Sequence, residues 1–284
     1  MADPKNINWF PGHMQKAKRE MQEKIKLVNI IYMVLDSRIP KSSFNPLIKE
    51  IATNRPILLL LNKADLADSM ETKKWMNYYK SQGYFCLDVD AITGYNMKKI
   101  VPYTYEILKD KIDKNKERGI KLSMKAMITG IPNVGKSTII NTLVKKKMTV
   151  TGDKPGVTKT QQWVKLDSNL DLLDTPGVLW PKLEENGINL ALTGAIKDDI
   201  MPLDQVVHFG FDFMNTYYQK SFYERYNIDS INNINDYYDK IAKARGCKND
   251  DYEKINNIFL HDLRHEKLGR VTIDRLTSIW ERAI

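Results

Sequence analysis

Short runs of apolar residues recur along the first two thirds of the chain, and each ends at or near a polar residue. The runs cover residues 30–35, 57–61, 85–89, 126–129, 163–166 and 170–173. Apolar segments this short are typical of strands, and unbroken ones of strands buried on both faces of a parallel sheet. The last two runs are close enough in sequence to form a hairpin. The pattern therefore predicts an α/β fold with a mostly parallel sheet.

Helical spacing is found between and beyond these strands. Apolar residues three and four apart mark an amphipathic helix near the N-terminus: Met14, Ala17, Met21, Ile25 and Val28. Lysine and arginine on its other faces make this helix basic. We also expect helices over residues 75–81 and 138–143, and one helix with a lysine-rich link over residues 98–125. The chain thus divides into an α/β domain, residues 1–183, and an α-helical domain, residues 184–284.

A glycine-rich loop follows the fourth strand. Residues 130–137 read GIPNVGKS, which fits the phosphate-binding pattern G-x-x-x-x-G-K-[ST] at every fixed position. The strand before it and the helix after it are the context that this motif needs. We expect Lys136 to reach the β- and γ-phosphates of a nucleotide and the Ser137 hydroxyl to hold Mg²⁺. The residues expected to contact the nucleotide here are Asn133, Val134, Gly135, Lys136, Ser137 and Thr138.

The second strand runs directly into Asn62-Lys63-Ala64-Asp65, an N-K-x-D box typical of guanine recognition. A carboxylate at Asp65 can accept hydrogen bonds from the ring N–H and the exocyclic amine of guanine, a donor pair that adenine lacks. We expect the Asn62 amide to reach the base edge. The Lys63 stem is expected to cover the ring while its ammonium supports the phosphate loop. The box favours GTP over the ATP of an ATPase or nucleotide kinase that uses the same phosphate loop.

Three further loops complete the predicted site. The loop after the third strand lies where GTPases support the base through a backbone N–H, and we assign Ala91 and Ile92 to that role. Thr158, in a turn-rich segment, is expected to place its hydroxyl on Mg²⁺ and its N–H near the γ-phosphate. Asp174 ends the last strand in the sequence D-T-P-G; we expect it to hold Mg²⁺ through water, with the Gly177 N–H at the γ-phosphate. The last two segments would act as nucleotide-dependent switches.

The order of these motifs is unusual. The guanine box at residue 62 precedes the phosphate loop at residue 130, whereas it normally follows that loop. Because all the loops gather at the carboxyl edge of one parallel sheet, the site survives rewiring if the old termini are joined. The chain then passes from Gly177 directly into the helical domain. A nucleotide switch is thereby coupled to whatever that domain contacts.

Composition narrows the choice of partner and compartment. The net charge of +9 divides into +13 over residues 1–183 and −4 over residues 184–284. This basic surface favours RNA over a membrane, because no lipidation motif or apolar run of bilayer-spanning length accompanies it. Cys86 and Cys247 stand far apart, so we expect packing residues in a reducing cytoplasm rather than a disulfide. We expect no membrane association and a monomer.

The reversed order and five motifs together resemble the circularly permuted GTPases, in particular the bacterial ribosome biogenesis GTPase A family. The motifs are WFPGHM, NKAD, GIPNVGKST, DKPGVT and DTPGVLWPK, and the similarity covers nearly the whole chain. The resemblance implies a Rossmann-like GTPase domain followed by a small helical domain. It also implies a role in late assembly of the large ribosomal subunit, with 23S rRNA as a partner and GTP hydrolysis stimulated by the ribosomal particle.

The same resemblance assigns catalytic roles. The family has an apolar residue, here Val178, where many GTPases place a glutamine that positions water. It gives a part in hydrolysis to an N-terminal histidine, here His13, and coordination of K⁺ to Asn133, where the ion replaces an arginine finger. Mg²⁺ and K⁺ are therefore the implied cofactors, and isolated turnover is expected to be slow. The expected catalytic residues are His13, Lys136, Thr158 and Gly177.

We therefore expect a GTPase that binds the precursor of the large subunit, hydrolyses GTP and leaves. Two alternatives remain from the sequence. One is a non-enzymatic RNA-binding scaffold that merely retains a nucleotide, and the other is a GTPase associated with tRNA or rRNA outside large-subunit assembly. Stimulation of hydrolysis by ribosomal particles would separate the enzyme from the scaffold.

Overall fold

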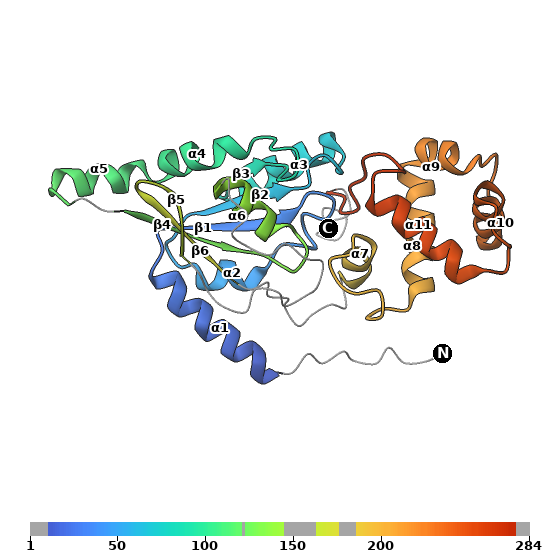
Figure 1. Ribbon diagram of the computed structural model, residues 1–284, viewed down its shortest axis with the longest axis horizontal. Coiled ribbons are helices and arrows are strands. Elements are labelled where there is room, and N and C mark those ends of the chain that lie inside the picture. The colour runs from blue at the N-terminus through green and yellow to red at the C-terminus, as the bar shows by residue number, and fades with distance from the viewer. Residues whose placement is uncertain (1–10, 121–122, 145–162, 176–185, 277–284) are drawn as a thin grey trace.

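The chain folds around one sheet, seen in a computed structural model that describes residues 11–120, 123–144, 163–175 and 186–276, with side chains from residue 19 onward. The described strands are β1 (Ile30–Asp36), β2 (Ile57–Asn62), β3 (Phe85–Asp88), β4 (Met124–Thr129), β5 (Trp163–Asp167) and β6 (Leu170–Asp174). They lie in the order β3-β2-β1-β4-β6-β5, and every neighbouring pair is parallel except β5 and β6. The predicted mostly parallel sheet, with a hairpin at its edge, is confirmed (Figure 1).

The register of the sheet aligns the polar residues that end the apolar runs. β1 and β2 are buried at every position, as their nearly unbroken apolar sequences require. Asp36 at the end of β1 pairs with Asn62 at the end of β2, and Ile128 of β4 pairs with Asp174 of β6. Because these strands are parallel, the loops that follow them share one edge of the sheet. The reversed motif order is therefore no obstacle to a single site.

Helices cover both faces of the sheet. They are α1 (Pro11–Lys26), α2 (Pro46–Ile51), α3 (Ser69–Ser81), α4 (Ile100–Ile107) and α6 (Lys136–Val144), whereas α5 (Lys109–Glu117) extends beyond the sheet (Figure 1). Buried residues of α1, α2 and α3 form a cluster with one set of strand side chains, which includes Met33 and Leu59. Buried residues of α4 and α6 belong to the cluster on the other face, which includes Tyr32 and Leu58. Since side chains alternate along a strand, each central strand contributes to both clusters.

The segment over residues 98–125 differs from the single helix that the sequence predicts. A 3₁₀ turn (Met97–Lys99) leads into α4, and α5 begins only after a break at Leu108. Leu108 is buried in the core, whereas α5 buries none of its residues. The break lets the charged helix α5 leave the sheet while Leu108 stays packed against it.

The C-terminal part is helical, as predicted. It contains α7 (Gly187–Leu192), α8 (Leu203–Tyr217), α9 (Gln219–Tyr226), α10 (Ile234–Arg245) and α11 (Tyr252–Arg264), grouped to one side of the sheet in Figure 1. Its core is aromatic: the Phe211 ring centroid lies 4.8 Å from that of Tyr237 and 4.7 Å from that of Phe259. Gly210 lets α8 approach α11 closely, because a Cβ there would lie 2.6 Å from Phe259 Cε1.

After α11 the chain returns to the α/β part through residues 271–275, which we call the return segment. Val271 N donates to Leu66 O at 3.0 Å, next to the guanine box. Ile273 N donates to Arg38 O at 2.7 Å, in the loop after β1. The return segment therefore supports two loops at the carboxyl edge of the sheet.

Candidate nucleotide-binding site

A cavity of about 570 Å³ lies at the carboxyl edge of the sheet, where the predicted loops meet. The guanine box and its neighbouring loop contribute Asn62, Lys63, Asp65, Ala91 and Ile92, and the phosphate loop and α6 contribute Asn133, Gly135 and Thr138. The helical part contributes Thr193, Gly194, Lys197, Arg264 and His265. A cavity of this size suits a small-molecule ligand such as a nucleotide. The structure thus brings the guanine box and the phosphate loop together.

Asn62 joins the guanine box to the phosphate loop. Its buried amide donates from Nδ2 to Val134 O at 2.8 Å and accepts at Oδ1 from Ala91 N at 3.1 Å. Gly135 makes this contact possible, because a Cβ built at its φ of +95° would overlap Asn62 Nδ2. We expected the amide to reach the base edge. Both of its polar atoms bind the protein, so Asn62 holds three loops in one arrangement, and its contact with the base edge stays a prediction.

Lys63 contacts a carboxylate that the sequence analysis did not select. Its ammonium lies 3.0 Å from Asp36 Oδ2, not against the phosphate loop as we expected. Asp36 also accepts hydrogen bonds from Arg38 Nε at 3.0 Å and Nη2 at 2.7 Å. Although burial opposes a charge here, Arg38 and Lys63 hold the pKa of Asp36 well below its usual range. The sequence contained one signal for this role of Asp36, because it is an acidic residue at the end of a buried strand.

Asp65 and the loop after β3 form the end of the cavity that suits a base. Burial, reinforced by the neighbouring Asp90, raises the pKa of Asp65. Ile92 is 84% exposed and offers apolar surface on the cavity wall. The Ala91 N–H donates to Asn62, and the Ile92 N–H donates to Asp90 Oδ1 at 2.8 Å. The contact expected between this loop's backbone and a base stays a prediction.

Lys136 is buried inside the phosphate loop, at the start of α6. Its ammonium donates to Gly130 O at 3.1 Å and to Ile131 O at 2.8 Å. Burial lowers the pKa of Lys136 to about 8, and the charge of nearby Asp174 acts in the opposite direction. The ammonium is therefore held beside the loop that a phosphate would enter, at the N-terminus of a helix.

Two of the three oxygen donors predicted for Mg²⁺, Ser137 and Asp174, are described, and their chemistry suits that ion. Asp174 Oδ2 is buried, and no hydrogen-bond partner for it lies within the described residues. Burial raises the pKa of Asp174, while the Lys136 ammonium acts against this shift. Ser137 adds a hydroxyl next to Lys136 at the start of α6. A carboxylate, a hydroxyl and phosphate oxygens are the hard ligands that Mg²⁺ prefers.

Two predicted residues lie outside the part of the chain that the structure describes, and a third lies within it without a described side chain. Thr158 falls in residues 145–162, and Gly177 falls in residues 176–185. His13 belongs to the backbone of α1, but its side chain is not among those described. Their roles stay predictions.

The helical part forms a wall of the cavity that the sequence analysis missed. Asn133 Nδ2 donates to Gly194 O at 3.0 Å, and Arg38 Nη2 donates to Thr193 O at 3.1 Å. The first bond leaves Asn133 Oδ1 as an oxygen ligand of the kind that K⁺ binds. No motif marks Thr193 or Gly194, because only the folded chain brings the end of α7 to the phosphate loop.

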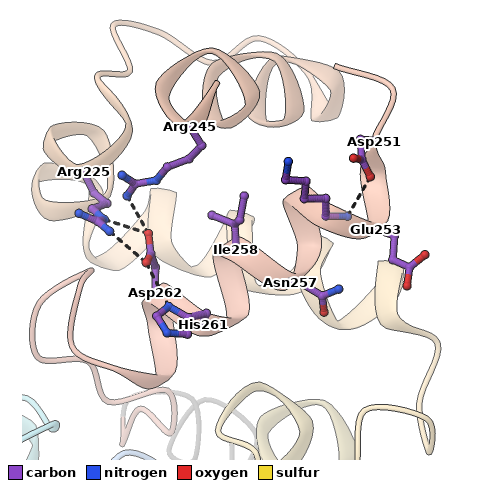
Figure 2. A pocket seen from close by; sticks show the side chains of 9 residues that line it. Arg225, Arg245, Asp251, Glu253, Asn257, Ile258, His261 and Asp262 are labelled. Carbon is purple, nitrogen blue, oxygen red and sulfur yellow. Dashed lines mark hydrogen bonds and ion pairs between the residues drawn. The ribbon is translucent and has the colours of Figure 1, made fainter. Parts of the chain in front are cut away.

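A second cavity, of about 630 Å³, lies within the helical part and is lined by none of the predicted nucleotide-binding residues. Figure 2 shows Arg225 and Arg245 directed at Asp262, which accepts hydrogen bonds from Arg225 Nε at 2.9 Å and Arg245 Nη2 at 2.8 Å. Carboxylates match its cationic side chains in number, so this cavity lacks the excess positive charge that a polyphosphate needs. The cavity at the sheet edge is therefore the candidate nucleotide site.

Known proteins are similar to this chain over both of its parts. A family model described as a 50S ribosome-binding GTPase matches residues 125–235. Ribosome biogenesis GTPase A of Priestia megaterium is 47% identical, over 94% of this chain and 96% of the relative. Mitochondrial ribosome-associated GTPase 1 of Xenopus tropicalis is 35% identical, over 78% of this chain and 74% of the relative. The GDP-bound structure of YlqF from T. maritima has a TM-score of 0.63 and 25% identity, and covers 91% of this chain and 100% of that chain.

Proposed function

Because this chain belongs to the ribosome biogenesis GTPase A family, whose members are GTPases of ribosome assembly, we propose that it acts on the precursor of the large ribosomal subunit. It binds this particle with GTP bound, contacts 23S rRNA, and leaves after hydrolysis. Residues 1–183 form the GTPase domain, and residues 184–284 form a helical domain that contacts the ribosome. The protein works as a monomer in the cytoplasm.

One observation carries the proposal: the hydrogen bond of 2.8 Å from Asn62 Nδ2 to Val134 O. It joins the guanine box to the phosphate loop although their order in the chain is reversed. A guanine nucleotide can therefore place its base at Asp65 in the cavity and its phosphates at the adjoining phosphate loop, which holds Lys136. The family relationship supplies the ribosome as the particle on which that nucleotide is used.

Each residue of the site has a role in this proposal. Lys136 binds the β- and γ-phosphates, and Asp65 accepts from the base. Ser137 and Asp174 hold Mg²⁺, whose charge would neutralise the phosphate oxygens when it is bound. The roles of the remaining predicted residues are proposed from the family resemblance or, for Thr158 and Gly177, from the switch motifs in the sequence. They are His13 for the attacking water, Asn133 for K⁺, Thr158 for Mg²⁺ and the γ-phosphate, and Gly177 for the γ-phosphate.

Charge supports a polyanionic partner. The excess of +13 over residues 1–183 lies in the part that binds the nucleotide. In the described part of the chain, no helix is both long enough and apolar enough to cross a bilayer. RNA phosphates are the abundant anions of an assembling ribosomal particle, so the basic surface fits that partner.

The test is GTP turnover with isolated large subunits, in potassium and in sodium. We expect slow turnover alone and stimulation of more than about tenfold by large subunits in potassium, since completing a GTPase site raises rates by orders of magnitude. Small subunits serve as the matched particle control. The GTP turnover of the Lys136→Ala protein gives the background that comes from contaminating activity.

Two outcomes would contradict the proposal as a whole, and a third would contradict its use of K⁺. Nucleotide binding without any stimulation would favour a scaffold that retains a nucleotide. Stimulation by small subunits or by tRNA, with none from large subunits, would favour a GTPase outside large-subunit assembly. Equal turnover in potassium and sodium would exclude K⁺ as a cofactor and, with it, the role assigned to Asn133.

A further inference from the structure

The end of α7 connects the helical part of the chain to the nucleotide site. We call residues 191–194 the α7 turn. The last carbonyl groups of a helix have no partner within the helix, so other groups must satisfy them. In the α7 turn, Arg264 at the end of α11 donates from Nη2 to Ala191 O at 2.6 Å and from Nε to Leu192 O at 3.1 Å. One guanidinium thereby ties α7 to α11.

The next two carbonyl groups of the α7 turn bind the other side of the cavity. Gly194 O accepts from Asn133 of the phosphate loop at 3.0 Å. Thr193 O accepts from Arg38 at 3.1 Å, and Arg38 shares the Asp36 carboxylate with Lys63 of the guanine box. The α7 turn therefore contacts Asn133 at the phosphate end of the nucleotide site. It also contacts Arg38, which supports the guanine box at the other end.

Arg264 is itself held in one geometry. Its side chain is 21% exposed and pairs with Asp198, with Nη2 2.5 Å from Oδ1 and Nη1 3.1 Å from Oδ2. Gly194 closes the turn with a φ of +72°, and a Cβ there would lie 3.4 Å from Arg264 Nε. The planar guanidinium suits this task, because its donors point in fixed directions to a carboxylate and to two carbonyl groups at once.

We propose that Arg264 is a positioning residue for the nucleotide site. It fixes the position of the α7 turn, and the carbonyl groups of this turn then hold Asn133 and Arg38. This inference rests on the proposed nucleotide site and adds its regulation. By linkage, a partner that shifts α11 changes the affinity for nucleotide, and nucleotide binding changes the affinity for that partner by the same factor. The helical part, which also lines the cavity, thus senses the phosphate loop through the α7 turn.

The experiment compares Arg264→Gln with Arg225→Gln in the full chain. Arg225 is a matched control, because it also forms a two-point pair with a carboxylate, here Asp262 (Figure 2). Within the described part of the chain, its hydrogen bonds go to Asp262 and not to the α7 turn. The probe is N-methylanthraniloyl-GDP, and its dissociation rate is followed by fluorescence. We expect R264Q to release the probe about fivefold to tenfold faster, and R225Q to stay within about twofold of the unchanged protein, as a typical coupling between sites allows.

A second measurement separates positioning from general loss of structure. In the unchanged protein and in R225Q, GDP should slow amide hydrogen exchange in residues 187–195 and 259–265. In R264Q this protection of residues 259–265 should disappear while the thermal unfolding transition persists. If R264Q does not fold, Asp198→Asn replaces it, because that change removes only the ion pair of Arg264; we expect faster release of the probe, by less than for R264Q.

Unchanged release from folded R264Q, or from D198N, would overturn the proposal. Equal acceleration in R225Q would do the same, since the effect would then not be specific to the α7 turn. Failure of the unchanged protein to bind the probe would overturn both this inference and the nucleotide site on which it rests.

Discussion

Asp65 presents a carboxylate to the cavity, and two properties of this residue depend on pH in opposite directions. Because burial and Asp90 raise its pKa, the folded protein takes up this proton at a higher pH than the unfolded chain does. The contribution of Asp65 to the free energy of unfolding therefore increases as the pH falls through the raised pKa. Guanine recognition needs the ionised form, so the affinity for GDP decreases over the same range.

We expect the affinity for GDP to weaken as the pH falls, and to begin weakening above the range in which an ordinary aspartate titrates. Equilibrium binding of a fluorescent GDP analogue at a series of pH values measures the effect. Asp65→Asn is the control, because it cannot titrate; it should bind GDP weakly at every pH and prefer xanthosine nucleotides. The same pH dependence in D65N and in the unchanged protein would assign the titration to another group.

Single residues were predictable where their role depends on sequence neighbours. Gly135 and Lys136 follow from the phosphate-loop pattern, and the structure places both at the cavity or beside it. The partners of Asn62 and Lys63 were not predictable, because Val134 and Asp36 are distant in sequence. A local motif gives a residue type, but the fold decides which of its atoms stay available to a ligand.

At the scale of elements, the contact between α8 and α11 decides how the helical part packs. Replacing a helical glycine by alanine normally stabilises a helix by about 1 kcal/mol. At Gly210 the added Cβ would lie 2.6 Å from Phe259 Cε1 and 3.0 Å from Leu192 Cδ2. Both neighbours are buried in the core, so they cannot move away without cost.

We therefore expect Gly210→Ala to lower the free energy of unfolding by about 1–3 kcal/mol, despite its better helix propensity. Urea unfolding followed by circular dichroism measures this. Gln205→Ala, at an exposed position of the same helix, should change stability by no more than about 0.5 kcal/mol. A G210A protein that is more stable than the unchanged one would mean that α8 and α11 are not in close contact.

Elements were predictable in proportion to their apolar pattern. The buried strands follow directly from short apolar runs, and their parallel pairing follows from the need to cover both faces. The break at Leu108 was missed, because one buried residue within a charged stretch does not change the helical pattern. The α7 turn was also missed, since its partners Arg38, Asn133 and Arg264 belong to three distant segments.

For the whole molecule, the uneven charge predicts how ribosome binding responds to salt. Lysine and arginine exceed acidic residues by 13 in residues 1–183, whereas acidic residues exceed them by 4 in the remainder. We expect the affinity for large subunits to fall at least about tenfold between about 50 and 200 mM KCl, because bound cations are released from RNA. Pelleting assays with large subunits, in the presence of a GTP analogue, measure this. An affinity that does not vary with salt would exclude phosphate contacts as the main source of binding.

At the scale of the whole molecule, the sequence was enough to predict that the loops form a single nucleotide site. Parallel strands place all their carboxyl ends together, so the reversed order of motifs already implied one nucleotide cavity. The share of the helical part in that cavity was not predictable. One buried cluster includes Val34 of β1 and Phe259 of α11, so hydrophobic contacts run without interruption from the sheet into the helices. The division into two domains at residue 183 therefore remains a proposal, because the described hydrophobic core is continuous across the two parts.

The return segment has a practical consequence for deletion experiments. Trimming the chain after Arg270 removes the N–H groups that Leu66 and Arg38 use, and also Asp274 O, which accepts from the buried Trp75 indole at 2.9 Å. A shortened protein that no longer binds ribosomes would therefore also have lost the hydrogen bonds that support its guanine loop. Point substitutions on the exposed faces of α9 and α10, rather than tail deletions, keep the two losses apart.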